Sequence, residues 1–438
     1  MDQSIFRITK ELSDIQKNPD LSLAVACRDV DVRNVKALIV GPHETPYEFG
    51  FFEFSIKFGN AYPSEPPAVQ CITTNNGSCR FNPNIYADGK VCLSILGTWR
   101  AEAGEQWSSA QGLESILLSI QSLMSSQPYT NEPGFETLKG PDCEKNSQEY
   151  TRKIRHETLR ISVIQRLEGY LNMRSDGQPI QPVYQHDSDI GSSDEEDFTF
   201  EPFKDLCKRR FLWYYDCYLA TIQEGKQHAT DNQQFKRAPF ESSGNMMPGC
   251  YNYSSLEQRL HRIKVALDKE AEQWAIDGLE EQRKETTVSV NLQYQFDHIN
   301  DLLKTSNDSY SIALENKNPF VWLISYFGPA LEGDVIAIKM TFSPRFPTEQ
   351  PRVQFENRIF HQRVSSQGVP CYIPNSMKVE DAKSHVDAIV GILEETAPTY
   401  DPRKIVNPEA TKLYWGSGTD GRRAYNRRLR RSIQDSMQ

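Results

Sequence analysis

The apolar residues of the first 170 positions follow a helical period at the start and form strand-like runs after it. One apolar stripe recurs every three or four residues and ends at Asn18-Pro19, which predicts an amphipathic first helix. Runs rich in aliphatic and aromatic residues follow at 35–41, 49–58 and 68–73, and they predict strands separated by Gly and Pro turns. The members of the helical stripe are Ile5, Ile8, Leu12 and Ile15.

A second helical stripe begins after an irregular stretch at 81–99 and ends before Pro128. A charged segment at 144–171 also has helical character. The order is therefore one helix, several antiparallel strands and further helices, which predicts an α+β fold. The second stripe contains Leu113, Ile116, Leu117, Ile120, Leu123 and Met124.

The pattern changes after the first 175 residues. The stretch 185–199 is acidic and nearly without apolar residues, and it predicts a flexible linker across 176–200. Helical spacing returns at 201–285, where the aromatic run 211–219 and a later apolar stripe indicate helix packing rather than a cofactor site. The later stripe contains Leu256, Leu260, Ile263, Leu267 and Trp274.

The last part of the chain, 286–438, repeats landmarks of the first part in the same order. Proline-bearing turns recur at similar spacing, and Cys92 is matched by Cys371. Shared landmarks of this kind predict the same fold twice, joined by the helical segment. The matched turns are Gly41-Pro42 with Gly328-Pro329, Tyr62-Pro63 with Phe346-Pro347, and Pro67 with Pro351.

Composition narrows the possible functions. The chain has 438 residues, of which 38% are hydrophobic and 25% charged, as is typical of a globular protein with two or three domains. Its formal net charge of −10 argues against general nucleic-acid binding, because phosphate contacts need a surplus of Lys and Arg. The arginine-rich run 421–431 is a local exception, which we interpret as solvated surface charge.

The nine cysteines occur singly, and no CxxC pair is present, so we expect no metal site. The N-terminal residues have no apolar signal core, and no run of about 18 apolar residues occurs. An odd number of scattered cysteines is typical of free thiols in a reducing compartment. We therefore expect a cytoplasmic or nuclear protein with no membrane partner.

The window 81–96, FNPNIYADGKVCLSIL, contains the cysteine with the most informative surroundings. It resembles the active-site segment of ubiquitin-conjugating enzymes, in which a Pro-Asn pair, an Ile-Tyr pair and an Asp-Gly turn precede a cysteine eight positions after the Asn. Here Pro83 and Asn84 form the first pair, and Cys92 is the cysteine. The upstream proline turns and the segment 107–110 fit the same family, over roughly the first 170 residues.

Further features resemble the Z-type branch of that family, and this likeness extends to about residue 270. Asn82 stands where most relatives have His. The branch is known for a selective activating partner. The other shared features are GTW at 97–99, NEPGFE at 131–136, IRHET at 154–158 and FLWYYDCY at 211–218.

The resemblance implies a UBC fold, with an N-terminal helix, a four-stranded antiparallel sheet and C-terminal helices, at 1–175 and in a degenerate copy at 286–438. It implies that Cys92 accepts ubiquitin, or a ubiquitin-like protein, as a thioester from a ubiquitin-activating enzyme. Transfer to a lysine of a substrate protein follows, usually with a ubiquitin ligase. No metal or organic cofactor is expected at the site, because the activating enzyme uses the ATP.

Cysteine suits this role because a thiolate is both a good nucleophile and a good leaving group. An inert buried thiol is the alternative for any single cysteine, and the surrounding motif favours catalysis at Cys92. Asn84 is expected either to donate to the oxyanion that forms when a lysine attacks, or to hold the loop by backbone hydrogen bonds. Glu132 takes the place of the family's acidic gate, where it would orient the lysine and help it lose a proton; a surface Glu is the alternative.

The resemblance also implies which residues contact the activating enzyme and the ligase, by their matching positions in the family. Arg7 and Lys10 lie on the first helix, where relatives meet the activating enzyme, and solvated cations are the alternative. Phe58, Ser109 and Ala110 fall where RING-type ligases dock. Phe58 is equally well explained as a core residue at the end of a strand.

The matching window of the second copy, 360–374, keeps a cysteine, Cys371, eight positions after Arg363. His361 takes the family's His position, but the Pro-Asn pair is lost and Pro370 precedes the cysteine. No acidic gate is evident unless Glu409 serves as one. We therefore predict a noncatalytic domain that binds ubiquitin, another partner or the first domain.

Two alternatives stand beside the conjugating-enzyme interpretation. The first is a nonenzymatic adaptor in which both folds only bind ubiquitin, and a missing cysteine would be typical of that class. The second is a conjugating enzyme for a different ubiquitin-like modifier. The activating enzyme chooses the modifier, so the sequence of this chain does not distinguish ubiquitin from a ubiquitin-like protein.

Overall fold

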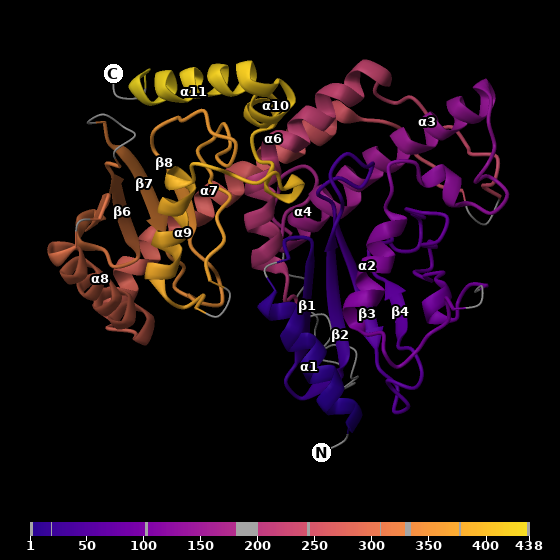
Figure 1. Cartoon of the computed structure of the whole chain (residues 1–438), viewed down its shortest axis with the longest axis horizontal. Helices are drawn as coiled ribbons and strands as arrows, with labels where there is room; N and C mark the ends of the chain where they lie inside the picture. The colour runs from indigo at the N-terminus through magenta and orange to yellow at the C-terminus, as the bar shows by residue number, and fades with distance from the viewer. Residues whose placement is uncertain are drawn as a thin grey trace. The chain divides into compact units, whose positions relative to one another are not determined.

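The computed structural model describes residues 3–18, 20–100, 104–180, 200–242, 246–306, 308–328, 334–375 and 378–435. These residues form two compact units, which are coloured along the chain in Figure 1. The predicted linker at 176–200 falls mainly on residues 181–199, which lie outside the described residues. The first unit comprises Met1–Cys207 and Thr221–Ile263, and the second comprises Lys208–Ala220 and Lys264–Gln438.

The first unit contains a four-stranded antiparallel sheet whose strands follow chain order. The three predicted runs correspond to β2, β3 and β4. The hydrophobic runs did not single out β1, because this six-residue strand, LAVACR, has only one β-branched residue. The strands are β1 (Leu23–Arg28), β2 (Asp31–Val40), β3 (Phe51–Lys57) and β4 (Ala68–Cys71).

Two helices close the core of this unit against the sheet, and both were predicted from their apolar stripes. Ile8 of the first helix and Ile116 of the second are fully buried, in one hydrophobic core with Phe54 of β3. Burying one aliphatic side chain of this size contributes about 1.5–3 kcal/mol. The helices are α1 (Gln3–Lys17) and α2 (Leu113–Leu123), and short 3₁₀ helices lie on either side of α2 at η1 (Ser94–Leu96) and η2 (Pro128–Asn131).

The charged segment predicted as helical at 144–171 forms one long helical run that passes close to the sheet. At Gly50 an added Cβ would lie 2.5 Å from the Ser162 hydroxyl, so the glycine allows this approach. Arg166 Nη1 lies 2.6 Å from Glu53 Oε2, and this ion pair fixes the run to β3. The run consists of α3 (Pro141–Glu157), the π-helical η3 (Thr158–Gln165) and α4 (Arg166–Tyr170).

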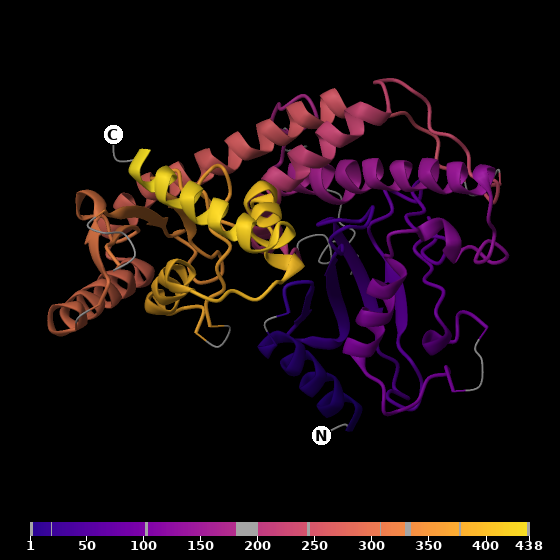
Figure 2. The ribbon, with the colours of Figure 1, turned by 45° about the horizontal axis from the view of Figure 1, so that its top comes forward.

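The helical extension predicted at 201–285 consists of two long helices, each divided between the two units. Within the first unit, Lys153 of α3 pairs with Glu241 from the loop between these helices, and both side chains are at most 3% exposed. Met247 of the same loop places its Sδ 3.6 Å from Cys79 Sγ. The end of the first long helix runs beside α3 in Figures 1 and 2. The two helices are α6 (Lys204–His228) and α7 (Tyr253–Arg283).

The second unit repeats the order of the first: a helix, a four-stranded antiparallel sheet and further helices. Trp322 is fully buried in its core and packs edge-on against Phe296. The predicted α+β class is therefore confirmed, and a second four-stranded sheet is present. The elements are α8 (Thr287–Thr305), β5 (Tyr310–Leu314), η4 (Glu315–Lys317), β6 (Val321–Tyr326), β7 (Ile336–Thr341), β8 (Arg352–Phe355), α9 (Ala382–Glu394), η6 (Pro402–Lys404), α10 (Pro408–Gly416) and α11 (Gly418–Asp435).

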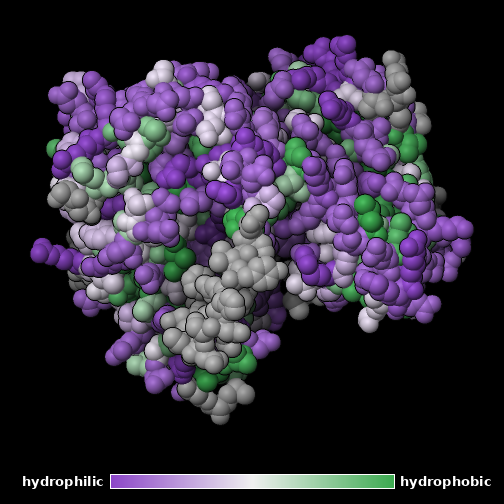
Figure 3. Space-filling model, turned by 180° about the vertical axis from the view of Figure 1, so that it is seen from behind, coloured by the Kyte–Doolittle hydropathy of each residue, from purple (hydrophilic) through white to green (hydrophobic). Residues whose placement is uncertain are grey.

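The face of the molecule in Figure 3 carries mostly hydrophilic side chains, and apolar side chains appear there only in scattered groups. Among the described helices, none combines the length and the apolar run that crossing a membrane requires.

Candidate active site

A tight turn at Asp88-Gly89 holds the loop that carries Cys92 against the edge of the first sheet. Gly89 has φ +89°, and an added Cβ would lie 2.5 Å from the carbonyl oxygen of Cys71 at the end of β4. The backbone N–H of Cys71 donates to the carbonyl of Gly89 at 2.8 Å. Only glycine combines this backbone conformation with such a close approach, so the Asp-Gly turn of the motif fixes the distance between loop and sheet.

Two hydrogen bonds join Cys92 and Asn84 across the loop. The backbone N–H of Cys92 donates to the Asn84 carbonyl at 2.8 Å, and Asn84 Nδ2 donates to the Cys92 carbonyl at 3.3 Å. A side-chain amide has two N–H groups, so one donor remains for an oxyanion. The structure therefore places Asn84 beside the cysteine, in a position compatible with both of its predicted roles.

Asn82 is fully buried and connects the active-site loop to two other segments. Its Nδ2 donates to the Tyr47 hydroxyl at 2.9 Å and to the Leu123 carbonyl at 2.8 Å. Its Oδ1 accepts from the backbone N–H of Asn84 at 2.9 Å. These bonds use both ends of the amide, so Asn82 supports the loop.

Cys92 is buried, with only 2% of the residue exposed. Burial raises the pKa of Tyr86, and the neighbouring Cys92 adds to this shift through its charge and a hydrogen bond. The Tyr86 hydroxyl therefore lies close to the Cys92 thiol. Cys92 is therefore almost fully enclosed by its neighbours.

Glu132, the predicted acidic gate, is held by a buried arginine. Arg80 Nη2 lies 3.1 Å from Glu132 Oε2, and the Arg80 guanidinium lies over the Tyr86 ring, 4.5 Å from its centroid. Glu132 follows η2 directly. A chain of contacts thus runs from Glu132 through Arg80 and Tyr86 to Cys92, and the carboxylate is ion-paired rather than free.

Arg80 and Tyr86 were not singled out as site residues by the sequence. Tyr86 belongs to the Ile-Tyr pair of the motif, so the family pattern contained a signal for it. Arg80 lies just before the motif, and its contact with Glu132 spans 52 residues of sequence. No local pattern reveals such a contact.

The two cations predicted to meet an activating enzyme both lie on α1. Arg7 pairs with Glu11 in the next turn and donates to the carbonyl of Gln111 at 3.2 Å. Lys10 is exposed. Arg7 is therefore partly engaged within the unit, whereas Lys10 is accessible to a partner.

The residues predicted to meet a ligase fall into two groups. Ser109 and Ala110 are exposed in the loop before α2. Phe58 is 4% exposed and packs against Tyr62, with ring centroids 4.6 Å apart. The Phe58 ring therefore lies in the core at the end of β3, as in the alternative that the sequence left open.

The second unit builds a similar loop around Cys371. The backbone N–H of Cys371 donates to the Arg363 carbonyl at 2.8 Å, and Arg363 Nη2 donates to the Cys371 carbonyl at 2.8 Å. This pattern repeats the bonds of Asn84 and Cys92. His361, ten residues before the cysteine, is buried, and burial lowers its pKa to about 4, so its ring is neutral at pH 7.

Cys371 is fully buried, and burial raises the pKa of its thiol although the charge of nearby Arg210 on α6 opposes the shift. The part of α6 that belongs to the second unit crosses this loop. Asp216 of α6 accepts hydrogen bonds from the backbone N–H of Ser366 at 2.6 Å and from its hydroxyl at 2.8 Å. Glu409, the other gate candidate, pairs with Arg428 of α11.

Comparisons with known proteins show what the chain is similar to. The family described as "Ubiquitin-conjugating enzyme" matches residues 7–158. A human protein named "Ubiquitin-conjugating enzyme E2 Z" is 37% identical over 273 residues, which cover 61% of this chain and 68% of that protein. The protein of the same name from Xenopus tropicalis is 38% identical over 261 residues, which cover 60% of this chain and 71% of that protein. The human "Dual E2 ubiquitin-conjugating enzyme/E3 ubiquitin-protein ligase BIRC6" is 43% identical over 149 residues, which are 33% of this chain and 3% of that protein.

Proposed function

This chain belongs to the ubiquitin-conjugating enzyme family, and from this premise we propose that Cys92 is the residue that carries the modifier. The protein is a ubiquitin-conjugating enzyme, and thus a transferase. The observation that favours Cys92 over the other eight cysteines is the motif window of the family around it, in which Asn84 makes two hydrogen bonds with Cys92. Cys371 makes the same pair of bonds with Arg363, but its window lacks the Pro-Asn pair. A nonenzymatic adaptor is not favoured, because the relatives at 37–43% identity are named as conjugating enzymes.

The proposed reaction consists of two acyl transfers. In the first, the Cys92 thiolate attacks the thioester carbonyl by which an activating enzyme holds the C-terminus of the modifier. A carbon–sulfur bond to Cys92 forms, and the activating enzyme's thiolate leaves. In the second, the amine of a substrate lysine attacks the Cys92 thioester, an amide forms, the Cys92 thiolate leaves, and the amine's proton passes to a base.

The residues around Cys92 have separate roles in this proposal. The second N–H of Asn84 stabilises the oxyanion of each tetrahedral intermediate. The Glu132 carboxylate orients the incoming lysine, and Arg80 fixes the carboxylate in place. Because the ion pair with Arg80 holds the carboxylate in one place, we assign Glu132 positioning more than proton removal.

Family members work with ubiquitin, an activating enzyme and ligases in general. For this chain we propose that Arg7 and Lys10 meet the activating enzyme and that Ser109 and Ala110 meet the ligase. The choice between ubiquitin and a ubiquitin-like protein rests with the activating enzyme. We expect no metal or organic cofactor at Cys92, and all nine cysteines are free, which favours a reducing compartment such as the cytoplasm or nucleus.

We propose that the second unit is noncatalytic and serves in binding. The raised pKa of the Cys371 thiol and the hydrogen bonds of α6 to Ser366 support this proposal. Burial alone does not distinguish the two cysteines, because Cys92 is buried too. A thiolate is the reactive form of cysteine, so a raised pKa lowers the reactive fraction at neutral pH.

A charging assay tests the proposed function. The full chain is incubated with ATP, an activating enzyme and ubiquitin, and the products are separated without reductant. We expect a band shift that reductant removes, that is lost in Cys92→Ala, and that becomes resistant to reductant in Cys92→Ser because an oxygen ester forms. Cys371→Ala is the matched control and should charge like the wild type. A shift that persists in Cys92→Ala would contradict the proposal.

A further inference from the structure

The last helix of the second unit, α11, carries the arginine-rich run at 421–431. Its six arginines are all exposed, and only two acidic residues, one near each end, lie on the same helix. The whole chain has a formal net charge of −10, so α11 is strongly positive within an otherwise acidic chain. The arginines are Arg422, Arg423, Arg427, Arg428, Arg430 and Arg431.

The opposite face of α11 is fixed to the second unit. Tyr425 and Ile433 are buried there. The Tyr425 hydroxyl accepts a hydrogen bond from the backbone N–H of Gln362 at 3.3 Å, and the Ser432 hydroxyl accepts one from the backbone N–H of Phe360 at 2.8 Å. The arginines therefore extend from a helix that is already in place, and a partner need not order it on binding.

Two of the six arginines have no acidic partner among the described residues. Arg427 and Arg430 are exposed, and neither forms an ion pair there. Arg423 lies 3.6 Å from Asp420, but both side chains are at least 79% exposed. Such a surface pair contributes little stability, so a ligand can replace it. The helix α11 therefore presents cations that the described part of the chain leaves accessible to a partner.

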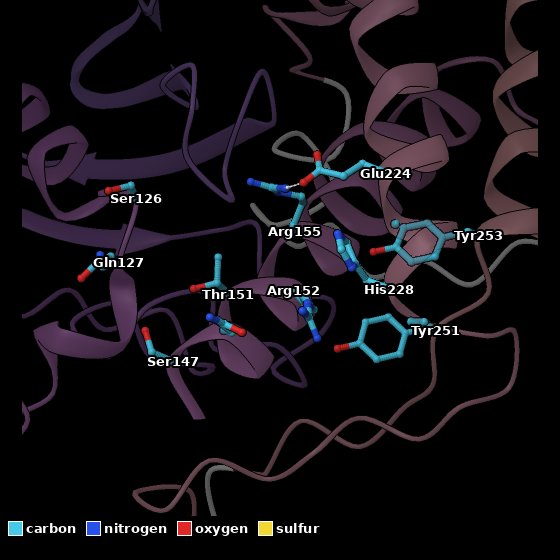
Figure 4. A pocket seen from close by; sticks show the side chains of 13 residues that line it. Ser126, Gln127, Ser147, Thr151, Arg152, Arg155, Glu224, His228, Tyr251 and Tyr253 are labelled. Atoms are coloured by element: carbon cyan, nitrogen blue, oxygen red, sulfur yellow. Dashed lines mark hydrogen bonds and ion pairs between the residues drawn. The ribbon is translucent and has the colours of Figure 1, made fainter. Parts of the chain in front are cut away.

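Two arginines beside the cavity of the first unit provide a contrast (Figure 4). Arg155 lies 2.9 Å from Glu224, and Arg152 lies 3.6 Å from Glu149. Both are thus paired within the first unit, whereas α11 has two exposed arginines without such a partner among the described residues.

Three of the arginines lie on one face of α11. Arg423, Arg427 and Arg430 are separated by four and three residues, a spacing that aligns side chains on a helix. They span about 10 Å along the axis, at about 1.5 Å per residue. An extended peptide advances about 3.3 Å per residue, so about four of its residues cover the same distance. A short acidic run is therefore long enough to meet all three arginines.

The surroundings of these arginines favour a peptide over a lipid surface or a nucleic acid. Leu429 and Ile433 pack in the core of the second unit and Tyr425 is buried, so this helix has no apolar face to insert into a lipid surface. Nucleic-acid binding gains its affinity from many phosphate contacts, and a strand that continued beyond α11 would meet a chain with an excess of acidic residues. A short peptide can contact the arginines alone.

We propose that α11 binds a short acidic segment of a partner protein, with carboxylates on Arg423, Arg427 and Arg430. A guanidinium fork pairs with both oxygens of one carboxylate, and arginine clusters recognise acidic peptide motifs in this way. This surface gives a defined class of partner to the binding role proposed for the second unit, on which the inference rests. Binding to α11 involves no step at Cys92.

Fluorescence anisotropy of the chain with a labelled octaglutamate peptide tests the proposal. Octaglutamine is the uncharged comparator, and an oligouridylate of equal charge and vesicles of equal parts phosphatidylserine and phosphatidylcholine represent the other two ligand classes. We expect octaglutamate to bind more tightly than the other three, and added salt to weaken its binding. The proposal is overturned when octaglutamate binds no better than octaglutamine, or when the oligouridylate or the vesicles bind more tightly. The assay needs no charging, so its failure would leave the assignment of Cys92 intact.

A pair of substitutions locates the binding. Arg427→Gln combined with Arg430→Gln should weaken octaglutamate binding about tenfold, because two exposed ion pairs with the peptide are lost. Arg174→Gln combined with Arg283→Gln is the matched control, since it removes the same charge from exposed positions outside α11. Both double variants should melt like the wild type, because surface substitutions change stability little. Octaglutamate binding that is unchanged in the α11 variant, or weakened equally in the control, would contradict the proposal.

Discussion

At the scale of single residues, Asn84 and Arg363 occupy matching places in two similar loops. Each lies eight residues before a cysteine, and each side chain donates to the carbonyl of that cysteine. Both cysteines are buried, but their surroundings differ. Cys92 lies beside Tyr86, whereas the loop of Cys371 is hydrogen-bonded to α6 through Ser366. Holding the loop is therefore common to both residues, and a contribution to catalysis is expected only from Asn84.

Asn84→Ala should separate these contributions. The loss of one oxyanion donor lowers a rate by about 100-fold to 1,000-fold, whereas the loss of one loop hydrogen bond costs only about 1 kcal/mol. We therefore expect transfer from Cys92 to free lysine to slow by about 100-fold, with a small decrease in melting temperature. Single-turnover discharge of the charged enzyme measures the rate.

Arg363→Ala is the control for this prediction, because it removes the corresponding bond from the second loop. Its discharge rate should equal that of the wild type. If Asn84→Ala transfers ubiquitin as fast as Arg363→Ala does, Asn84 only supports the loop.

The motif window revealed the cysteine and the asparagine at this scale, but not their buried neighbours. The Asp-Gly turn could be predicted because a positive φ restricts the residue type. The pairing of Arg80 with Glu132 depends on how η2 meets the loop, which sequence spacing does not encode. Phe58 was ambiguous because an apolar residue at a strand end fits either the core or a contact surface, and packing against Tyr62 decides for the core.

At the scale of elements, the loop between α6 and α7 is attached to α3 by a buried ion pair. Lys153 and Glu241 are 1% and 3% exposed, and burial lowers the pKa of Lys153 although the Glu241 charge opposes this. Removing one partner of a buried pair leaves an uncompensated charge in the interior. The attachment of this loop should therefore depend strongly on Glu241.

We expect Glu241→Gln to lower the free energy of unfolding by about 3–5 kcal/mol, as measured by urea denaturation of the full chain. Glu224→Gln is the matched control, because it removes a carboxylate from an ion pair of α3 that lies at the surface. A surface pair contributes about 0–1 kcal/mol. Equal losses in the two variants would show that burial of the Lys153 pair has no energetic consequence.

The helices α1 and α2 were predictable because three or four apolar residues recur on one face and pack against the sheet. The strand β1 was not predicted from its residues, since its place depends on pairing with β2 rather than on a strong apolar run. The division of α6 and α7 between two units was not predictable either. The apolar residues recur at the same helical spacing along the whole of each helix. This spacing does not indicate which of the two units a given turn packs in.

At the scale of the whole molecule, the two units should respond differently to acid. His361 and His385 of the second unit are buried, and burial lowers the pKa of each to about 4. Unfolding exposes both rings, which then take up protons near pH 6.5. The unfolded state thus binds more protons between pH 6.5 and 4, so the stability that these neutral rings contribute is complete above pH 6.5 and is lost as the pH falls toward 4.

The loss should reach about 3 kcal/mol for each histidine at pH 4. Hydrogen exchange of the full chain, corrected for the intrinsic pH dependence of exchange, should show the second unit losing protection between pH 7 and pH 5. His361→Asn gives that position the residue that the first loop has at Asn82, and it should reduce this dependence. If protection of the second unit depends on pH in His361→Asn as it does in the wild type, the loss of stability in acid does not come from His361.

The central claim is that residue 92 accepts the modifier, and peptide mapping by mass spectrometry tests it most directly. The Cys92→Ser chain is charged with ubiquitin through an activating enzyme and ATP, digested, and searched for the ester-linked Gly-Gly remnant of ubiquitin. We predict the remnant on residue 92 and none on Cys371. A remnant on Cys371, or a charged chain with residue 92 unmodified, would contradict the assignment.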